Sequence, residues 1–134
     1  MVCNSMVVII DSQIAGISGD MMLSALVNIG ANKSKVIDGA HEAESYLAGS
    51  KIQKFEFGKT IKHGIEATEI LLDIKENVHD RKGIEIQECI LLTSDKIGLS
   101  EKAKVFAKDS IRLLINAESK IHGEPIESVH FHEA

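Results

Sequence analysis

The chain has 134 residues, of which 44% are hydrophobic and 26% are charged, and its formal net charge is −5. This length is typical of a single domain, and one proline with ten glycines excludes a low-complexity or collagen-like chain. Binding to nucleic acid is not expected, because an acidic chain without a basic cluster does not displace counterions from a phosphate backbone. We therefore expect one domain over residues 1–134.

The first predicted element is the apolar run MVVIID at residues 6–11. A short continuous apolar run that ends at an acid is typical of a strand buried on both faces, so we expect a central strand here. The run is too short to cross a bilayer, and no positively charged segment precedes it. No membrane association and a cytoplasmic location are the expectations.

Two helices are predicted after the loop SQIAGISG. The first begins at Asp20 and ends before Gly30, because apolar residues recur at helical spacing in DMMLSALVNIGA. The second spans Ser34 to Ala48 and is closed by Gly49.

An antiparallel hairpin is predicted next. The segments KIQKFEFGKTIK and IEATEILLDIKE alternate apolar and polar residues, and HG joins them. Phe55, Phe57 and Ile61 share one face of the first strand.

Two further helices are predicted, from Ile84 to Lys96 and from Leu99 to Ile121, with Ser100 as a cap and Gly123 as the stop. We expect one stripe of the last helix to form its buried face. The stripe comprises Leu99, Ala103, Phe106, Leu113, Ala117 and Ile121. Pro125 suits the start of a short helical turn, and SVHF is expected to be extended.

This order of elements predicts an α+β fold, with a small mixed sheet of three or four strands, including the hairpin, packed with about four helices. So small a sheet leaves an edge that a homo-oligomer could cover. Cys3 and Cys89 are expected to be free thiols, Cys89 in the core.

The first candidate site is GISGDM, between the apolar run and the first helix. Gly16, Ser18, Gly19 and Asp20 could hold a phosphate on backbone N–H groups, or a cation through Asp20. An ordinary turn capped by Ser18 or Asp20 explains the same residues.

The second candidate site is the segment HGEPIESVHFHEA at residues 122–134. His130 and His132 are two residues apart, so both rings lie on one face of an extended segment. Glu133 or His122 could supply a third ligand, and this donor set suits zinc, nickel, copper or iron(II). Partly exposed histidines without a metal are the alternative.

Three segments in order give the chain a family resemblance. GISGDMMLSALVNIGA, HGIEATEI and AESKIHGEPIESVHFHEA resemble the N-terminal region of the LarC family of nickel-insertion proteins. The resemblance implies CTP-dependent insertion of nickel into a pyridinium bisthiocarboxylic acid mononucleotide, which yields the nickel-pincer cofactor of lactate racemase. The nickel ends up bound by carbon and sulfur.

The resemblance changes what we expect of both candidate sites. The Gly16–Asp20 turn becomes a candidate for holding a phosphate or a cation. His122, His130, His132 and Glu133 become candidate nickel ligands or proton acceptors. The pyridinium mononucleotide precursor becomes the expected small-molecule partner.

The chain departs from the family pattern at its end, because family members usually continue into a separate C-terminal domain that binds CTP. We therefore expect CTP and a divalent cation to act only when that domain is supplied, for example as a C-terminal partner chain. Enzymatic activity of this chain alone is left open. The alternatives are a non-catalytic binding or assembly module and an anion-binding domain without a metal.

Overall fold

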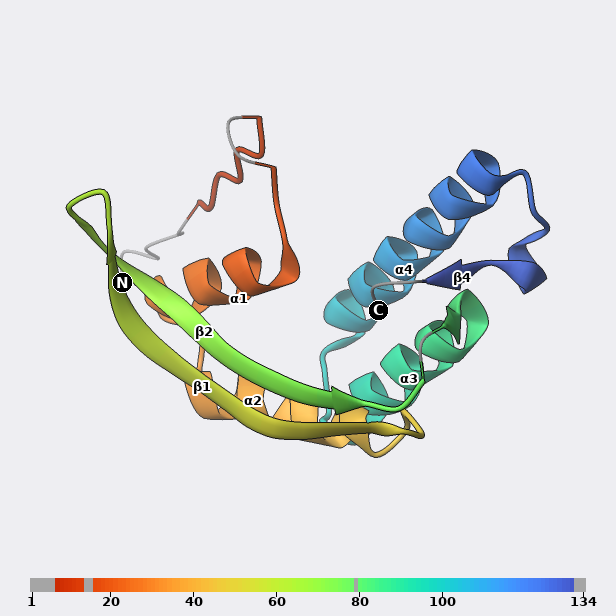
Figure 1. Cartoon of the computed structure of the whole chain (residues 1–134), viewed down its shortest axis with the longest axis horizontal. Coiled ribbons are helices and arrows are strands. Elements are labelled where there is room, and N and C mark those ends of the chain that lie inside the picture. Colours follow the sequence, from red (N-terminus) through yellow and green to blue (C-terminus); the bar gives the residue numbers. More distant parts are fainter. Residues whose placement is uncertain (1–6, 14–15, 79, 132–134) are drawn as a thin grey trace. The chain divides into compact units, whose positions relative to one another are not determined.

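A computed structural model of the chain describes residues 7–13, 16–78 and 80–131 (Figure 1). The described elements are α1 (Gly19–Asn28), α2 (Lys33–Glu44), β1 (Ser50–Lys62), β2 (Ile65–Glu76), β3 (Arg81–Lys82), α3 (Gly83–Lys96), α4 (Glu101–His122), the 3-10 turn η1 (Ile126–Ser128) and β4 (His130–Phe131). The α+β class, the four helices and the hairpin are confirmed. No helix in the described ranges is long and apolar enough to cross a membrane.

The residues group into two compact units. The first unit comprises residues 1–31 and 57–70, and the second comprises residues 32–56 and 71–134. The hairpin β1–β2 contributes its tip to the first unit and its base to the second. A single domain over residues 1–134 stays a prediction.

In the first unit, the two strands of the hairpin are joined by His63 and Gly64, which have φ angles of 52° and 80°. Positive φ at both central residues is typical of a tight type I′ turn, whose twist matches that of the strands it joins. The HG dipeptide therefore forms the turn that the sequence predicts.

The predicted central strand at residues 6–11 is wrong over its described part, residues 7–11, which form no strand. Val7 is 81% exposed and Ile9 is 87% exposed. A strand that is apolar on both faces needs neighbours on both edges and cover on both faces. The described part of the chain provides no strand that pairs with this segment.

The four strands lie in two sheets of two strands, β1–β2 and β3–β4, rather than in the single mixed sheet that we expected. β3 pairs antiparallel with β4, and Lys82 lies opposite His130. The extended SVHF segment is therefore confirmed at His130–Phe131.

The core of the second unit lies between α3, α4 and the C-terminal segment. Ile111, Ile115 and Val129 are buried together. A Cβ atom on Gly83 would lie 2.9 Å from Cγ1 of Ile115, so glycine allows α3 to begin close against α4. Figure 1 shows α3 and α4 side by side, with β4 next to them.

The last helix begins at its predicted cap, because the Ser100 side chain accepts a hydrogen bond from the Ala103 N–H at 3.3 Å. The second helix begins at a cap that was not predicted, Asn32, whose side chain accepts from the Lys35 N–H at 3.0 Å. α4 ends at Gly123, whose φ of 66° is left-handed. α2 ends four residues before the predicted Ala48, and turns replace its last part.

The expected buried stripe of α4 is wrong. Phe106 is 75% exposed, Leu113 is 71% exposed and Ile121 is 74% exposed. The helix instead buries Ile111 and Ile115. α4 has apolar residues on two faces, and spacing alone did not show which face packs against the core.

Candidate functional site

The Gly16–Asp20 turn leads into α1 and fixes one carboxylate at the start of the helix. Gly16 has a φ of 70°, and its N–H donates to the Ser12 carbonyl at 3.0 Å. The Ser18 hydroxyl donates a short hydrogen bond to the Asp20 carboxylate, and the Met21 N–H donates to the same oxygen at 2.8 Å. Asp20 thus supplies the first-turn acceptor, whereas the Ser18 side chain caps no backbone group.

These two donors hold the pKa of Asp20 below its ordinary value, the Ser18 hydroxyl having the larger effect. A hydrogen bond to the charged form favours ionisation. Asp20 is therefore negatively charged at neutral pH, at a point where a phosphate would also have to bind.

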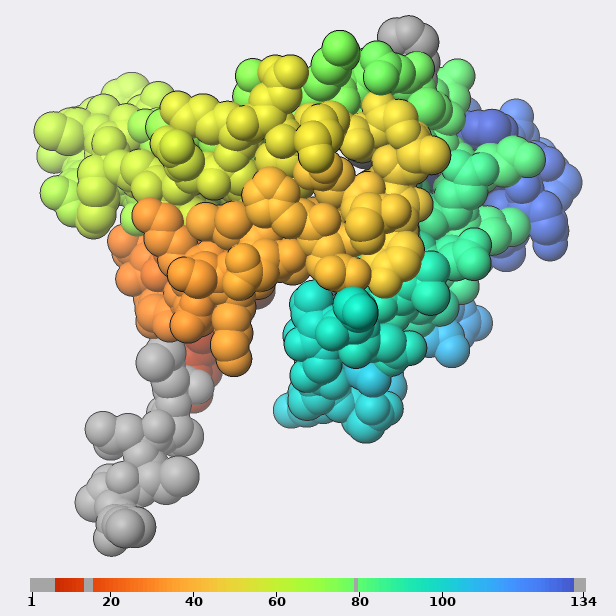
Figure 2. All heavy atoms as spheres, turned by 90° about the horizontal axis from the view of Figure 1, so that it is seen from below, coloured from red at the N-terminus to blue at the C-terminus, as the bar shows by residue number. Residues whose placement is uncertain are grey.

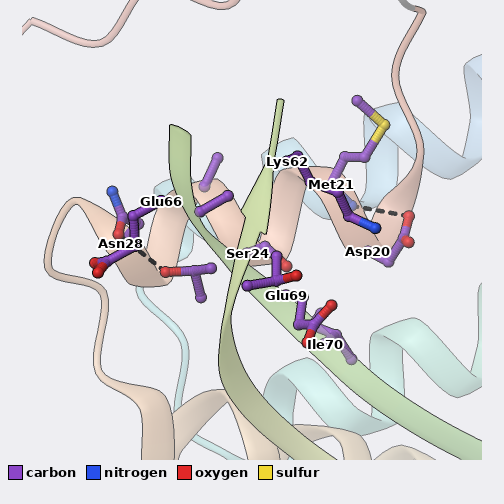
Figure 3. A pocket seen from close by; sticks show the side chains of 12 residues that line it. Asp20, Met21, Ser24, Asn28, Lys62, Glu66, Glu69 and Ile70 are labelled. Carbon is purple, nitrogen blue, oxygen red and sulfur yellow. Dashed lines mark hydrogen bonds between the residues drawn. The ribbon is translucent and has the colours of Figure 1, made fainter. Parts of the chain in front are cut away.

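Asp20 lines a cleft of about 550 Å³ between α1 and the hairpin tip, within the first unit. Figure 3 shows Asp20 and Asn28 at opposite ends of α1. The lining residues are Asp20, Met21, Ser24, Ala25, Asn28, Thr60, Lys62, Glu66, Ala67, Thr68, Glu69 and Ile70. Gly16, Ser18 and Gly19 do not line it.

The charges of this cleft favour a cation over a phosphate. Asp20, Glu66 and Glu69 bring three carboxylates, whereas Lys62 is its one basic lining residue. The Lys59 ammonium pairs with Glu66 at 2.6 Å from outside the lining, and this pair keeps the pKa of Glu66 low. Of the two ligands that the turn could hold, the electrostatics support the cation.

The C-terminal segment brings His122 and His130 together, as the second candidate site requires. His122 is the last residue of α4, and its Nε2 lies 3.2 Å from a carboxylate oxygen of Glu118. After Gly123, the Ser119 hydroxyl donates to the Glu124 carbonyl at 2.6 Å and holds the turn against the helix. The chain then returns through η1 to His130.

His122 and His130 line one pocket of about 220 Å³ in the second unit, together with Asp80, Glu124 and Val129. In the described part of the chain, Nδ1 of His130 is the buried side-chain atom that has no hydrogen-bond partner. An unsatisfied buried nitrogen costs about 1 to 3 kcal/mol, and this one belongs to a residue that lines the pocket. We name this pocket the histidine pocket.

The histidine pocket holds two of the four predicted metal ligands. His132 and Glu133 lie outside the described residues. Over residues 7–13, 16–78 and 80–131, no three His, Cys, Asp or Glu side chains are arranged to hold a metal ion. The described residues therefore form at most part of a ligand set.

Sequence reasoning gave no role to Asp80 or Glu124, two carboxylates that line the histidine pocket. Asp80 directly precedes β3, and the pairing of β3 with β4 brings the start of β3 close to the tail. Only that pairing could have revealed Asp80, because 50 positions separate it from His130 in the sequence. Glu124 directly follows Gly123, the predicted end of the last helix, so the sequence could have placed its carboxylate close to His122.

Cys89 is a free, buried thiol, as predicted. Its Sγ donates to the Ala43 carbonyl at 3.5 Å, and burial raises its pKa. A protonated core thiol is a poor nucleophile and a poor metal ligand. Cys3 lies outside the described residues.

The sequence of this chain matches one known protein family. A model of the nickel insertion protein family matches residues 8–134. The chain belongs to this family.

Curated relatives carry the same description. The chain is 40% identical over 121 residues to the pyridinium-3,5-bisthiocarboxylic acid mononucleotide nickel insertion protein of Staphylococcus epidermidis, a match that covers 89% of this chain and 28% of the relative. It is 36% identical over 125 residues to the protein of that name from Geobacillus kaustophilus, covering 89% and 29%. A putative nickel insertion protein of Methanothermobacter thermautotrophicus is 28% identical over 130 residues, covering 96% and 30%.

The chain thus spans less than a third of the length of these relatives. No solved structure shows significant similarity to it.

Proposed function

We propose that this chain takes part in inserting nickel into a pyridinium bisthiocarboxylic acid mononucleotide and that its histidine pocket binds the incoming nickel ion. The relatives are named for this mononucleotide and for nickel insertion. The observation that carries the proposal is the unpartnered Nδ1 of His130, a residue that lines one pocket together with His122. Imidazole is a common ligand of nickel(II).

His132 and Glu133 complete the ligand set in this proposal. His132 is two residues from His130, so an extended chain directs both rings to one side. Together, His122, His130 and His132 supply three imidazoles, and Glu133 supplies one carboxylate. This donor set suits nickel(II).

The carboxylates of the histidine pocket provide the base that the reaction needs. Attaching nickel to a ring carbon of the pyridinium displaces the proton of that carbon, so a proton acceptor must lie near the metal. Asp80 and Glu124 line the pocket with His122 and His130. We assign proton acceptance to one of these two carboxylates.

Activity in this proposal depends on the rest of the family protein. CTP, its divalent cation and the production of the lactate racemase cofactor belong to the whole protein, of which this chain spans less than a third. The test supplies the remainder of the S. epidermidis relative as a separate polypeptide, with CTP, magnesium, nickel(II) and the mononucleotide. We expect nickel to enter the mononucleotide only when both polypeptides are present. Equal incorporation by the remainder alone would remove this chain from the reaction.

The second candidate function is a non-catalytic binding or assembly module of the same fold. The exposed apolar residues of α4 favour it, because they offer a surface for a partner. In the same assay, a module would support incorporation even after His130→Ala and His132→Ala, whereas a nickel-binding chain would lose it.

A further inference from the structure

α4 has a second apolar face that the core does not use. Ile111 and Ile115 point into the core with Val129. Phe106, Leu113, Ala117 and Ile121 are all exposed, and we name these four residues the outer stripe. The beginning of α4, in teal, is visible at the surface in Figure 2.

The outer stripe is continuous along the helix. Residues advance about 100° each, so spacings of seven, four and four keep the four side chains within an arc of about 80°. From Phe106 to Ile121 the stripe is about 22 Å long. Ile111 and Ile115 lie about 80° and 120° beyond the nearer edge of the stripe, which makes the stripe a separate face.

An apolar groove extends the surface toward the core. Leu114, which is 53% exposed, lies between the outer stripe and the buried face. It lines a groove of about 650 Å³ together with Ile86, Ile90 and Phe131. A partner on the stripe could insert a side chain into this groove.

The length of the relatives suggests a partner for the outer stripe, namely the part of the family protein that lies outside the match. Since 121 residues are 28% of the S. epidermidis relative, that protein has about 430 residues, and about 310 of them lie outside the match. Two copies of this chain would instead bring together two net charges of −5, which repel each other.

We propose that the outer stripe is the docking surface for an apolar face of that remaining part of the family protein. This proposal rests on the proposed function only in that the chain works together with the remainder; it needs no nickel. It goes beyond that function by assigning the contact to α4.

Thiol labelling tests the proposal directly. Leu113→Cys is made in a Cys3→Ser background, both in the isolated chain and in a fusion of this chain to the remainder of the S. epidermidis relative. Val105→Cys is the matched control, because Val105 is 56% exposed on the same helix but about 80° or more away from the stripe. Cys89 is 5% exposed and reacts slowly in both proteins.

We expect the cysteine at position 113 to react at least tenfold more slowly in the fusion than in the isolated chain, while position 105 reacts equally in both. Equal rates at position 113 would overturn the proposal. Slow, concentration-dependent labelling of the isolated chain would also overturn it, because a second copy would then be the occupant. Neither outcome depends on nickel, so failure here is distinct from failure of nickel binding.

Discussion

The two units of the chain bury hydrophobic side chains very differently. The second unit contains the buried hydrophobic residues of the described chain, which are Phe55, Cys89, Ile111, Ile115 and Val129. The first unit, where it is described, buries only Ser24. Burial of apolar surface is the main stabilising contribution to folding, so we assign the stability of this chain chiefly to its second unit. The first unit instead presents an acidic cleft.

The largest expected loss of stability in this comparison follows from the substitution of a buried arginine in the second unit. Arg81 is 6% exposed and donates to the Ala48 carbonyl at 2.9 Å, to the Ser50 hydroxyl at 2.6 Å and to Glu76 at 2.7 Å. Arg81→Met removes these three hydrogen bonds and leaves Glu76 without its positive partner, so we expect a loss of about 3 to 5 kcal/mol in the free energy of unfolding, measured with urea.

The matched control is Lys59→Met in the first unit. Its pair with Glu66 is mostly exposed, at 65% and 68%, so solvent screens it and we expect no clear change in the urea midpoint. Equal losses for Arg81→Met and Lys59→Met would break the comparison between the units.

Ile115→Ala probes the core itself. Ile115 is 2% exposed, and removing three buried carbons leaves a cavity, so we expect a loss of about 3 kcal/mol. Leu113→Ala, at a 71% exposed position on the same helix, should cost about 0.5 kcal/mol or less in the isolated chain. Comparable losses in urea unfolding would mean that α4 packs through the outer stripe.

Glu76 should make the stability of the second unit depend on pH. The Ser50 hydroxyl, followed by the Arg81 guanidinium, holds the pKa of Glu76 below its ordinary value of 4.5. The unfolded chain therefore binds the proton more readily than the folded chain does. The resulting stability is fully present above about pH 4.5 and is lost as the pH falls through the folded pKa.

Urea midpoints measured from pH 7 to pH 3 check this direction. Glu76→Gln removes the titrating group, so its stability should fall less steeply over the acid range. If the urea midpoint of Glu76→Gln falls as steeply with pH as that of the unchanged chain, other carboxylates cause the acid sensitivity.

A small effect is expected at the start of α1. Asp20→Asn removes a charge from the first turn while keeping an oxygen that can accept from the Met21 N–H. The favourable interaction of an acid with the helix N-terminus is lost, so the thermal midpoint should fall by a few degrees at most, about 5 °C or less. A loss as large as that of Ile115→Ala would show that the first unit is as important to stability as the second.

Local signals predicted the local structure well. Ser100 and Gly123 marked the ends of the last helix through capping chemistry, and the HG dipeptide marked the hairpin turn. These features depend on a few neighbouring residues, so they can be read from sequence. The packing of α4 could not, because both of its faces carry apolar residues and the choice between them depends on α3 and the tail.

The predicted central strand failed for a related reason. Its apolar pattern describes a segment that needs cover on both faces, and the described part of the chain does not supply that cover to residues 7–11. Of the residues that line the histidine pocket, His130 and His122 were among the ligands that the sequence predicted, and their metal role stays a prediction. Asp80 could not be predicted, because its place there depends on the pairing of β3 with β4.

Calorimetric titration with nickel(II) tests the central claim, nickel binding by the tail, most directly. The intact chain is compared at pH 7 with His130→Ala/His132→Ala and with the control His41→Ala/His63→Ala, which removes two histidines from α2 and the hairpin turn. We predict one nickel site in the intact chain and in the control, and at least a tenfold loss of affinity in the tail variant. Unchanged affinity in the tail variant would contradict the account.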